Sequence, residues 1–441
     1  MKSAMFTTQL TVLSLSLSLL FSSTSAEVLN VPDDYGSIQA AIEASGNRDT
    51  ILVQPGIYAG DIDFLRKNIT VGSLYLTTGD AGYRDETIID AGNDGRPVTC
   101  RSGEGNRSVL AGFTLRNGQV VDGGGVYCRG SSPTLDNLAV IGNRASGKGG
   151  GIFCDDYASP VITNSVISSN DANEQGGGIY CNEHSSPRLT HVEVISNSGS
   201  TGGGIYCNNS SRAVLTDVTV SGNRADVMGG GIHCARDSDV HMLRVAVVDN
   251  YAESMRAGGI YIGISDVRME NVTIARNRTD GDGGGIHFMG TCHPVLKNAV
   301  LWGNSPNQVY QQGSPDPAAS IEISYSDIEA GGNGVVITGN ARLEWGNGNI
   351  DTNPLFSDEE NGDYNLTENS PCIDTGDPES DPDPDGTRAD MGAFYFDQLD
   401  VPKSEDVISE EFRLFPAFPN PFNSTTTITY ALPALSPVSL K

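Results

Sequence analysis

Hydrophobic residues recur in fixed columns between residues 126 and 304. Within this region, short stretches alternate between apolar and polar residues and are separated by Gly, Ser-Pro or Asn. This alternation predicts β-strands, and the region shows no 3.6-residue helical period. A β-branched residue follows a pair or triplet of glycines every 26–28 residues, at Val126, Ile152, Ile179, Ile205, Ile232, Ile260 and Ile286.

A unit of about 27 residues with so few apolar positions cannot bury its apolar face alone, so successive units must stack. Stacking in register places equivalent residues on neighbouring parallel strands, about 4.8 Å apart. The sequence therefore predicts an all-β fold, a right-handed parallel β-helix. The handedness follows the usual preference of parallel crossover connections.

A column of cysteines lies two positions after the β-branched residues. Both columns share strand parity, so both are predicted to face the core. Stacked cysteines on parallel strands have parallel Cβ directions, which fit disulfide geometry poorly, and we expect reduced, buried thiols. Cys100, Cys292 and Cys372 are expected outside this column and receive no pairing. The column members are Cys128, Cys154, Cys181, Cys207 and Cys234.

Asparagines and glycines are predicted to form the corners of the coil. The asparagines are expected where left-handed backbone is tolerated, with amides bonding from coil to coil. The glycines are expected at a second corner that a Cβ atom would crowd. The asparagine column consists of Asn143, Asn170, Asn197, Asn223, Asn250, Asn277 and Asn304.

A ring column lies between the isoleucine and cysteine columns and has the opposite parity. Stacked rings exposed on the outside would offer flat faces to sugar rings or to a partner protein. Cross-strand ring stacking also stabilises a sheet without any ligand, so a purely cohesive role stays open. The candidate ligand-binding residues are Tyr127, Phe153, Tyr180, Tyr206, His233, Tyr261 and His287.

The GGG-[IV] and xx-N elements resemble the repeats of polymorphic outer membrane proteins. More broadly, residues 27–345 resemble the pectin-lyase-like right-handed β-helix superfamily, which carries an asparagine ladder. The phenylalanine of the outer membrane protein FxxN element is absent, because this chain has VIGN, ISSN, VSGN and LWGN. The resemblance implies a secreted or cell-surface protein that binds, or acts on, polysaccharide.

Five segments are predicted. Residues 1–26 have the pattern of a secretory signal peptide. Residues 27–345 form the β-helix, starting with a capping helix at about 37–44 and a strand from Thr50. Residues 346–397 form a C-terminal cap, and 398–412 a linker. Residues 413–441 resemble the start of a type IX secretion sorting domain, a β-sandwich that is truncated here. That resemblance implies a partner in the secretion machinery and a location at a bacterial outer membrane or outside the cell.

The net charge of −28 restricts the partners. Such a field repels phosphate backbones and anionic lipid, so neither nucleic acid nor a membrane surface is an expected partner. Beyond the predicted signal peptide, no apolar run reaches membrane-spanning length.

One carboxylate cluster follows the cysteine column. Stacking would bring Asp155 and Asp156 near Glu183 on the next coil, beside amide oxygens, as a candidate calcium site. Pectate lyases, which share the resembled fold, hold calcium between coils and use an arginine as base. By that resemblance Arg236 is the candidate catalytic base. A solvated acidic rim on an acidic chain is the alternative.

A second candidate calcium site lies in the C-terminal cap. Asp381, Asp383 and Asp385 precede Gly386 in the first half of an EF-hand-like loop, but Gly392 stands where the last ligand would be glutamate. Calcium is the only cofactor that the sequence suggests.

The favoured function is binding or adhesion to a glycan or matrix at the cell surface. A pectate-lyase-like polysaccharide lyase or hydrolase is the first alternative, although the NTD, GHG and RIK motifs of polygalacturonases are absent. A structural surface protein is the second. The expected partner is a polysaccharide or surface glycan, or another protein.

Overall fold

The computed structural model describes residues 26–265, 267–313, 319–398, 413–414 and 430–431. The predicted signal peptide, the linker and most of the predicted sorting segment therefore lie outside the described residues. Two short strands of that segment, β40 (Arg413–Leu414) and β41 (Tyr430–Ala431), pair antiparallel. Of the helices within the described ranges, none has the length and apolar character needed to cross a membrane.

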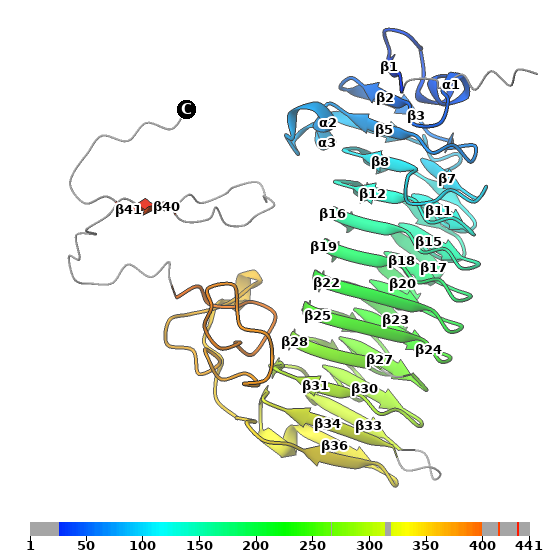
Figure 1. Ribbon diagram of the computed structural model, residues 1–441. Helices are drawn as coiled ribbons and strands as arrows, with labels where there is room; N and C mark the ends of the chain where they lie inside the picture. The colour runs from blue at the N-terminus through cyan, green and yellow to red at the C-terminus, as the bar shows by residue number, and fades with distance from the viewer. Residues whose placement is uncertain (1–25, 266, 314–318, 399–412, 415–429, 432–441) are drawn as a thin grey trace, which may run out of the picture.

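The chain winds into a parallel β-solenoid whose coils rise along one axis (Figure 1). A typical coil contributes β15 (Ile152–Asp155), β16 (Val161–Ser168) and β17 (Asp171–Gln175) to three different sheets. Successive coils pair in parallel and in register, with Ile152 opposite Ile179. The prediction of an all-β parallel solenoid is confirmed.

The three sheets contain eleven, nineteen and seven strands. The 11-stranded sheet comprises β4 (Ile62–Asp63), β7 (Val98–Cys100), β11 (Val126–Arg129), β15, β18 (Ile179–Cys181), β21 (Ile205–Cys207), β24 (Ile232–Ala235), β27 (Ile260–Gly263), β30 (Ile286–Met289), β33 (Val309–Gln312) and β36 (Val335–Thr338). The 7-stranded sheet comprises β10 (Gln119–Val120), β14 (Arg144–Ala145), β17, β20 (Ser198–Thr201), β23 (Arg224–Met228), β26 (Tyr251–Ala252) and β29 (Arg278–Thr279).

The 19-stranded sheet is the most extensive. It comprises β1 (Val28–Val31), β2 (Thr50–Val53), β3 (Gly56–Ala59), β5 (Thr70–Ser73), β6 (Thr87–Asp90), β8 (Val109–Ala111), β9 (Thr114–Arg116), β12 (Thr134–Asp136), β13 (Ala139–Ile141), β16, β19 (Arg188–Ile195), β22 (Arg212–Ser221), β25 (Asp239–Val248), β28 (Val267–Ala275), β31 (Val295–Lys297), β32 (Val300–Trp302), β34 (Ser320–Ser324), β35 (Asp327–Ile328) and β37 (Arg342–Trp345).

A short helix closes the N-terminal end of the solenoid. The helix α1 (Ile38–Ala44) begins after Ser37, whose Oγ accepts a hydrogen bond from the Ala40 amide. Its buried face belongs to the same core cluster as the strands. The predicted capping helix is confirmed. The remaining helical turns are α2 (Tyr75–Thr78), α3 (Tyr83–Glu86), η1 (Gly331–Gly334) and η2 (Glu359–Asn361).

The core is filled by the isoleucine and cysteine columns, as the strand parity predicted. All eight cysteines are buried, and none forms a disulfide. One prediction was wrong: Cys100 does not lie outside the column, because β7 places it opposite Cys128. The six stacked thiols run from Cys100 to Cys234. The hydrogen bond with the neighbouring Cys128 thiol, together with burial, raises the pKa of Cys100.

The asparagine column forms a buried ladder along the corner between the 19-stranded and 7-stranded sheets. From Asn143 to Asn277, each Nδ2 donates to the Oδ1 of the asparagine one coil on, at 3.0–3.1 Å, and to a backbone carbonyl. Asn304, the last member, donates to Gln308 Oε1 instead. The coil-to-coil bonding was predicted correctly. The left-handed residue stands one position earlier, however, as at Ser169 and Gly222.

The glycine corner is as crowded as predicted. A Cβ on Gly178 would approach the Gly204 carbonyl to 2.6 Å and Asn197 Nδ2 to 3.0 Å. Gly176, at the start of the same triplet, has φ +66° and therefore favours glycine on backbone grounds as well.

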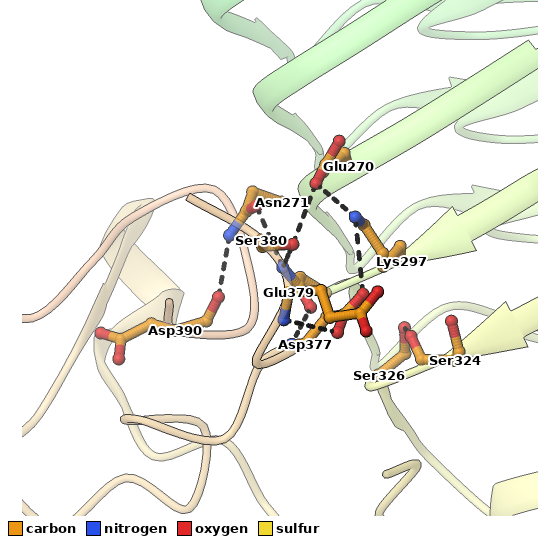
Figure 2. A network of polar contacts seen from close by, with 10 residues as sticks. Glu270, Asn271, Lys297, Ser324, Ser326, Asp377, Glu379, Ser380 and Asp390 are labelled. Carbon is orange, nitrogen blue, oxygen red and sulfur yellow. Dashed lines mark hydrogen bonds and ion pairs between the residues drawn. The ribbon is translucent and has the colours of Figure 1, made fainter. Parts of the chain in front are cut away.

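The C-terminal cap folds back against the 19-stranded sheet beside β28 and β31 (Figure 1). It contains η2, β38 (Phe356–Asp358) and β39 (Asp363–Leu366). Figure 2 shows polar contacts that fasten it, among them those of Ser380 and Asp390. Asn298 Oδ1 accepts from the Asp377 amide at 2.7 Å, and Asn298 Nδ2 donates to Ser380 Oγ at 3.2 Å. The ammonium group of Lys297 lies 2.8 Å from Glu270.

Candidate functional site

The turns that follow four strands of the 11-stranded sheet stack into a continuous polar strip. We call this strip, made of residues 155–157, 182–184, 208–210 and 235–237, the turn ladder. Backbone bonds fix its register, because the amide of Tyr157 donates to the carbonyl of Glu183 and that of His184 to the carbonyl of Asn209. Equivalent side chains therefore project from neighbouring coils one strand spacing apart.

The middle of the turn ladder is a chain of amide hydrogen bonds. Asn182 Nδ2 donates to Asp155 Oδ1 at 2.9 Å, and Asn182 Oδ1 accepts from Asn208 and Asn209 at 3.1 and 3.0 Å. Asn208 is buried, and its own Oδ1 has no hydrogen-bond partner among the described residues. The strip is thus a fixed chain of amide groups with one buried, unsatisfied acceptor.

An exposed pair of rings stands at one end of the turn ladder. Tyr157 and His184 stack with ring centroids 4.9 Å apart and planes 18° apart. Tyr157 is 65% exposed, so the pair projects from the surface. Tyr157 did not figure in the predicted site. The sequence contained a sign of this pair, because Tyr157 and His184 are one 27-residue period apart and therefore lie on neighbouring coils.

The predicted calcium site in the turn ladder does not assemble. The Arg129 guanidinium lies 3.9 Å from Asp155 and 3.7 Å from Asp156, and Glu183 is exposed. Across the described ranges, no group of three or more His, Cys, Asp or Glu side chains could hold a metal ion. Left-handed backbone at Asp156 and Glu183 makes the turn.

Arg236, the predicted base, lies at the far end of the turn ladder. Its Nη1 is 3.5 Å from Asn209 Oδ1. Within the described part of the chain, no carboxylate lies within ion-pair distance of it. The structure therefore separates the predicted base from the predicted metal ligands by the amide chain.

The acidic loop of the cap is organised by backbone hydrogen bonds. Gly386 makes the predicted turn, with φ +84°. Asp385 accepts from the Thr387 amide and hydroxyl, Asp383 accepts from the Asp390 amide, and Asp381 is exposed. The three aspartates predicted as calcium ligands do not form a group of metal-ligating side chains within the described ranges.

The ring column of the 11-stranded sheet was predicted to be exposed, and that prediction was wrong. Neighbouring ring centroids are 4.5–5.6 Å apart, so each ring covers the faces of the next. Arg96 covers Tyr127, the half-buried first ring, at 4.6 Å. The column also continues to Tyr310, an eighth member that a shorter repeat step concealed. The buried members are Phe153, Tyr180, Tyr206, His233, Tyr261 and His287.

Burial sets the protonation of this column. It lowers the pKa of His233 to about 3 and that of His287 to about 4, so both imidazoles are neutral at neutral pH. It also raises the pKa of Tyr206. The column therefore carries no charge and offers no free ring faces, apart from its ends, which makes it a cohesive element of the sheet.

Comparison with known families agrees with the fold. The right-handed β-helix region model matches residues 203–373. The β-solenoid is a right-handed β-helix. The Chlamydia polymorphic membrane protein repeat matches residues 137–155 of this β-helix, which confirms the predicted similarity of the repeats.

Two individual proteins are similar to the β-helix chain. The metabotropic glutamate receptor-like protein P of Dictyostelium discoideum is 32% identical over 124 residues, which are 27% of this chain. The match spans only 8% of that relative's length. The crystal structure of the pectate lyase Pel9A is 14% identical, with a TM-score of 0.49, covering 84% of this chain and 97% of the lyase.

Proposed function

We propose that the protein is an exported surface protein that binds glycan through the turn ladder. The observation that carries the proposal is the exposed, stacked pair of Tyr157 and His184 beside a fixed chain of amides. Aromatic faces pack against the apolar faces of sugar rings, and amide groups donate to and accept from hydroxyls. The repeat spacing places both kinds of group on one strip.

The surface location rests on two kinds of support. One repeat is similar to a repeat named for a polymorphic membrane protein of Chlamydia. The first 26 residues have the pattern of an export signal. Recognition by secretion machinery through the C-terminal segment stays a prediction.

Binding is favoured over lyase chemistry by the geometry of the turn ladder. Elimination from an acidic sugar needs a base beside a group that neutralises the sugar carboxylate. Arg236 instead contacts Asn209, and the described residues bring no three metal-ligating side chains together. A passive structural role would not account for the exposed ring pair of Tyr157 and His184, because such a role requires no ligand-binding surface.

A glycan array on the mature chain, followed by titration calorimetry, tests this function. Removing each ring of the pair should weaken binding about fivefold, since one ring contact contributes about 1 kcal/mol. Tyr157→Ala and His184→Ala are therefore compared with Trp345→Ala, which removes an exposed ring on β37, away from the turn ladder. Equal affinities in all three variants, or unsaturated products released from the bound glycan, would contradict a binding function of the turn ladder.

A further inference from the structure

A second concave surface lies on a different corner of the β-helix, between the 19-stranded and 7-stranded sheets. It has a volume of about 450 Å³ and is bounded by Arg276, Arg278, Trp302, Ser305 and, from the C-terminal cap, Glu359. We propose that this cavity, the junction cavity, binds one anionic saccharide unit, a sugar ring bearing a carboxylate or a sulfate. The ligand class rests on the proposed glycan binding, but the cavity is separate from the turn ladder.

The repeat sequence itself creates the junction cavity. Arg278 lies opposite Ser305 on the next coil, and the Cγ of Arg276 lies near Gly303. Two long side chains in one coil are thus followed by two of the smallest in the next. The step leaves a notch in the corner, and Glu359 of the cap contributes to its lining.

Arg278 supplies a charge that no carboxylate neutralises. Its guanidinium carbon lies 4.5 Å from the centre of the Tyr251 ring, which holds the group in place. Within the described ranges, no carboxylate lies within ion-pair distance of Arg278. The neighbouring Arg276, by contrast, is 3.2 Å from Asp249, and this pair raises the pKa of Arg276.

Asp249 also ties this corner to the cap, because it accepts a hydrogen bond from Tyr364 Oη at 2.6 Å. These contacts hold the two arginines in place before any ligand arrives, which reduces the entropy cost of binding. Arg278 can bind one oxyanion bidentately. Glu359 supplies an acceptor for hydroxyl groups and would repel a second anionic group.

Size and lining favour a sugar as the carrier of that anion. The volume falls in the range of small-molecule sites, about 300–1,000 Å³, and fits one or two sugar units. Trp302 is half-buried at the edge of the cavity and offers a ring surface and one N–H donor. A glutamate side chain of a partner protein would use the guanidinium but little of the remaining volume.

Titration with defined oligosaccharides tests the proposal on the full mature chain. The probes are a glucuronate-containing oligosaccharide, a sulfated one and a neutral xylo-oligosaccharide. Binding is measured by calorimetry and by the emission of Trp302 in a Trp345→Phe background, where Trp302 is the only tryptophan left. We expect one anionic probe or both to change the Trp302 emission, and the neutral probe to leave it unchanged.

Two variants alter the junction cavity in different ways. Arg278→Ala removes the charge, and Ser305→Tyr fills the notch while keeping Arg278. Each should lower affinity for the anionic probes at least about tenfold. Arg188→Ala is the matched control, because it removes another exposed arginine with no ion pair among the described residues. Unchanged affinity in both cavity variants, or a drop of the same size in Arg188→Ala, overturns the proposal.

The proposals for the turn ladder and for the junction cavity can be refuted independently of each other. Tyr157→Ala and His184→Ala could leave glycan affinity unchanged while Arg278→Ala abolishes the Trp302 response. That result would refute glycan binding by the turn ladder and support anion binding by the junction cavity. If an acidic peptide of glutamates competes more strongly than either anionic sugar, the saccharide assignment is wrong.

Discussion

A single asparagine in the ladder supports two coils at once. Asn223 Oδ1 accepts from both the backbone amide and the Nδ2 of Asn197, and Asn223 Nδ2 donates to the Val194 carbonyl. Asn223→Ala removes these three buried hydrogen bonds, so we expect it to cost about 3 kcal/mol or more. Chemical denaturation measures the loss. Ser221→Ala, at the end of β22 two residues earlier, should change stability by no more than about 0.5 kcal/mol. Equal losses would show that the ladder bonds are not the cause.

The buried side chain of His233 makes the free energy of unfolding depend on pH. Burial lowers the pKa of His233 from 6.5 to about 3, so the unfolded chain binds this proton first. Stability is therefore fully present above pH 6.5 and falls as the pH drops toward 3, by about 1.4 kcal/mol per unit. His233→Tyr, which copies its stacked neighbours Tyr206 and Tyr261, should flatten that decline between pH 6 and 4. His241→Gln, at an exposed site, should not. A steeper decline in His233→Tyr would contradict the assignment.

The repeat period fixes which residues face in, but not which outward residues reach solvent. Ile152 and Cys154 could be assigned to the core because strand parity is a local property. Burial of Tyr180 depends on rings one coil above and below, and on the side chains that close the column edges. Exposure of Tyr157 depends on a turn whose left-handed backbone the sequence pattern did not reveal. The core was thus predictable, while the surface site was not.

At the scale of elements, the docked C-terminal cap depends on one left-handed position. Asn298 has φ +51° and makes side-chain hydrogen bonds to the cap at Asp377 and Ser380. Asn298→Gly keeps this backbone and removes those bonds, so we expect faster proteolysis within residues 346–398. Asn164→Gly changes the equivalent position, where the side chain bonds only Asp136, and should leave the cleavage rate unchanged. Equal rates in both variants would show that other contacts hold the cap.

The same cap should bind more tightly in mild acid. Burial, with the nearby charges of Asp383 and Asp374, raises the pKa of Asp390 from 3.8 to about 7. Because the folded pKa is the higher one, folding gains stability as the pH falls from about 7 to 4. Trp302 packs beside the cap cluster, so its emission in a Trp345→Phe background reports docking.

We expect the denaturant midpoint of the Trp302 signal to rise over that pH range in the Trp345→Phe protein. In Asp390→Asn this rise should be smaller, because the amide carries no charge to bury. An equal rise in both proteins would assign the effect to another group, such as Asp327, whose pKa burial also raises to about 6.

At the scale of the whole molecule, a β-helix grows by adding identical coils, so its ends must be protected from further growth. The strand β1 pairs with β2, and α1 packs on both, so the helix covers the end of the core. An uncovered parallel edge with an open apolar core is a template for another chain. The net charge of −28 opposes contact between copies at long range, but salt screens that repulsion.

Ile42→Asp should therefore uncover the N-terminal end of the β-helix, so that copies of the chain associate through it. Ile42 is fully buried in the core cluster, and a carboxylate there would expel α1 from the core rather than remain unpaired. Light scattering should show end-to-end oligomers that increase with salt, because screening removes the repulsion between copies. Glu43→Ala alters the exposed side of the same helix and should stay monomeric at every salt concentration. If the Ile42→Asp protein is monomeric at high salt, the first coil resists edge pairing even without α1. In that case α1 stabilises the end of the β-helix but does not protect it against association.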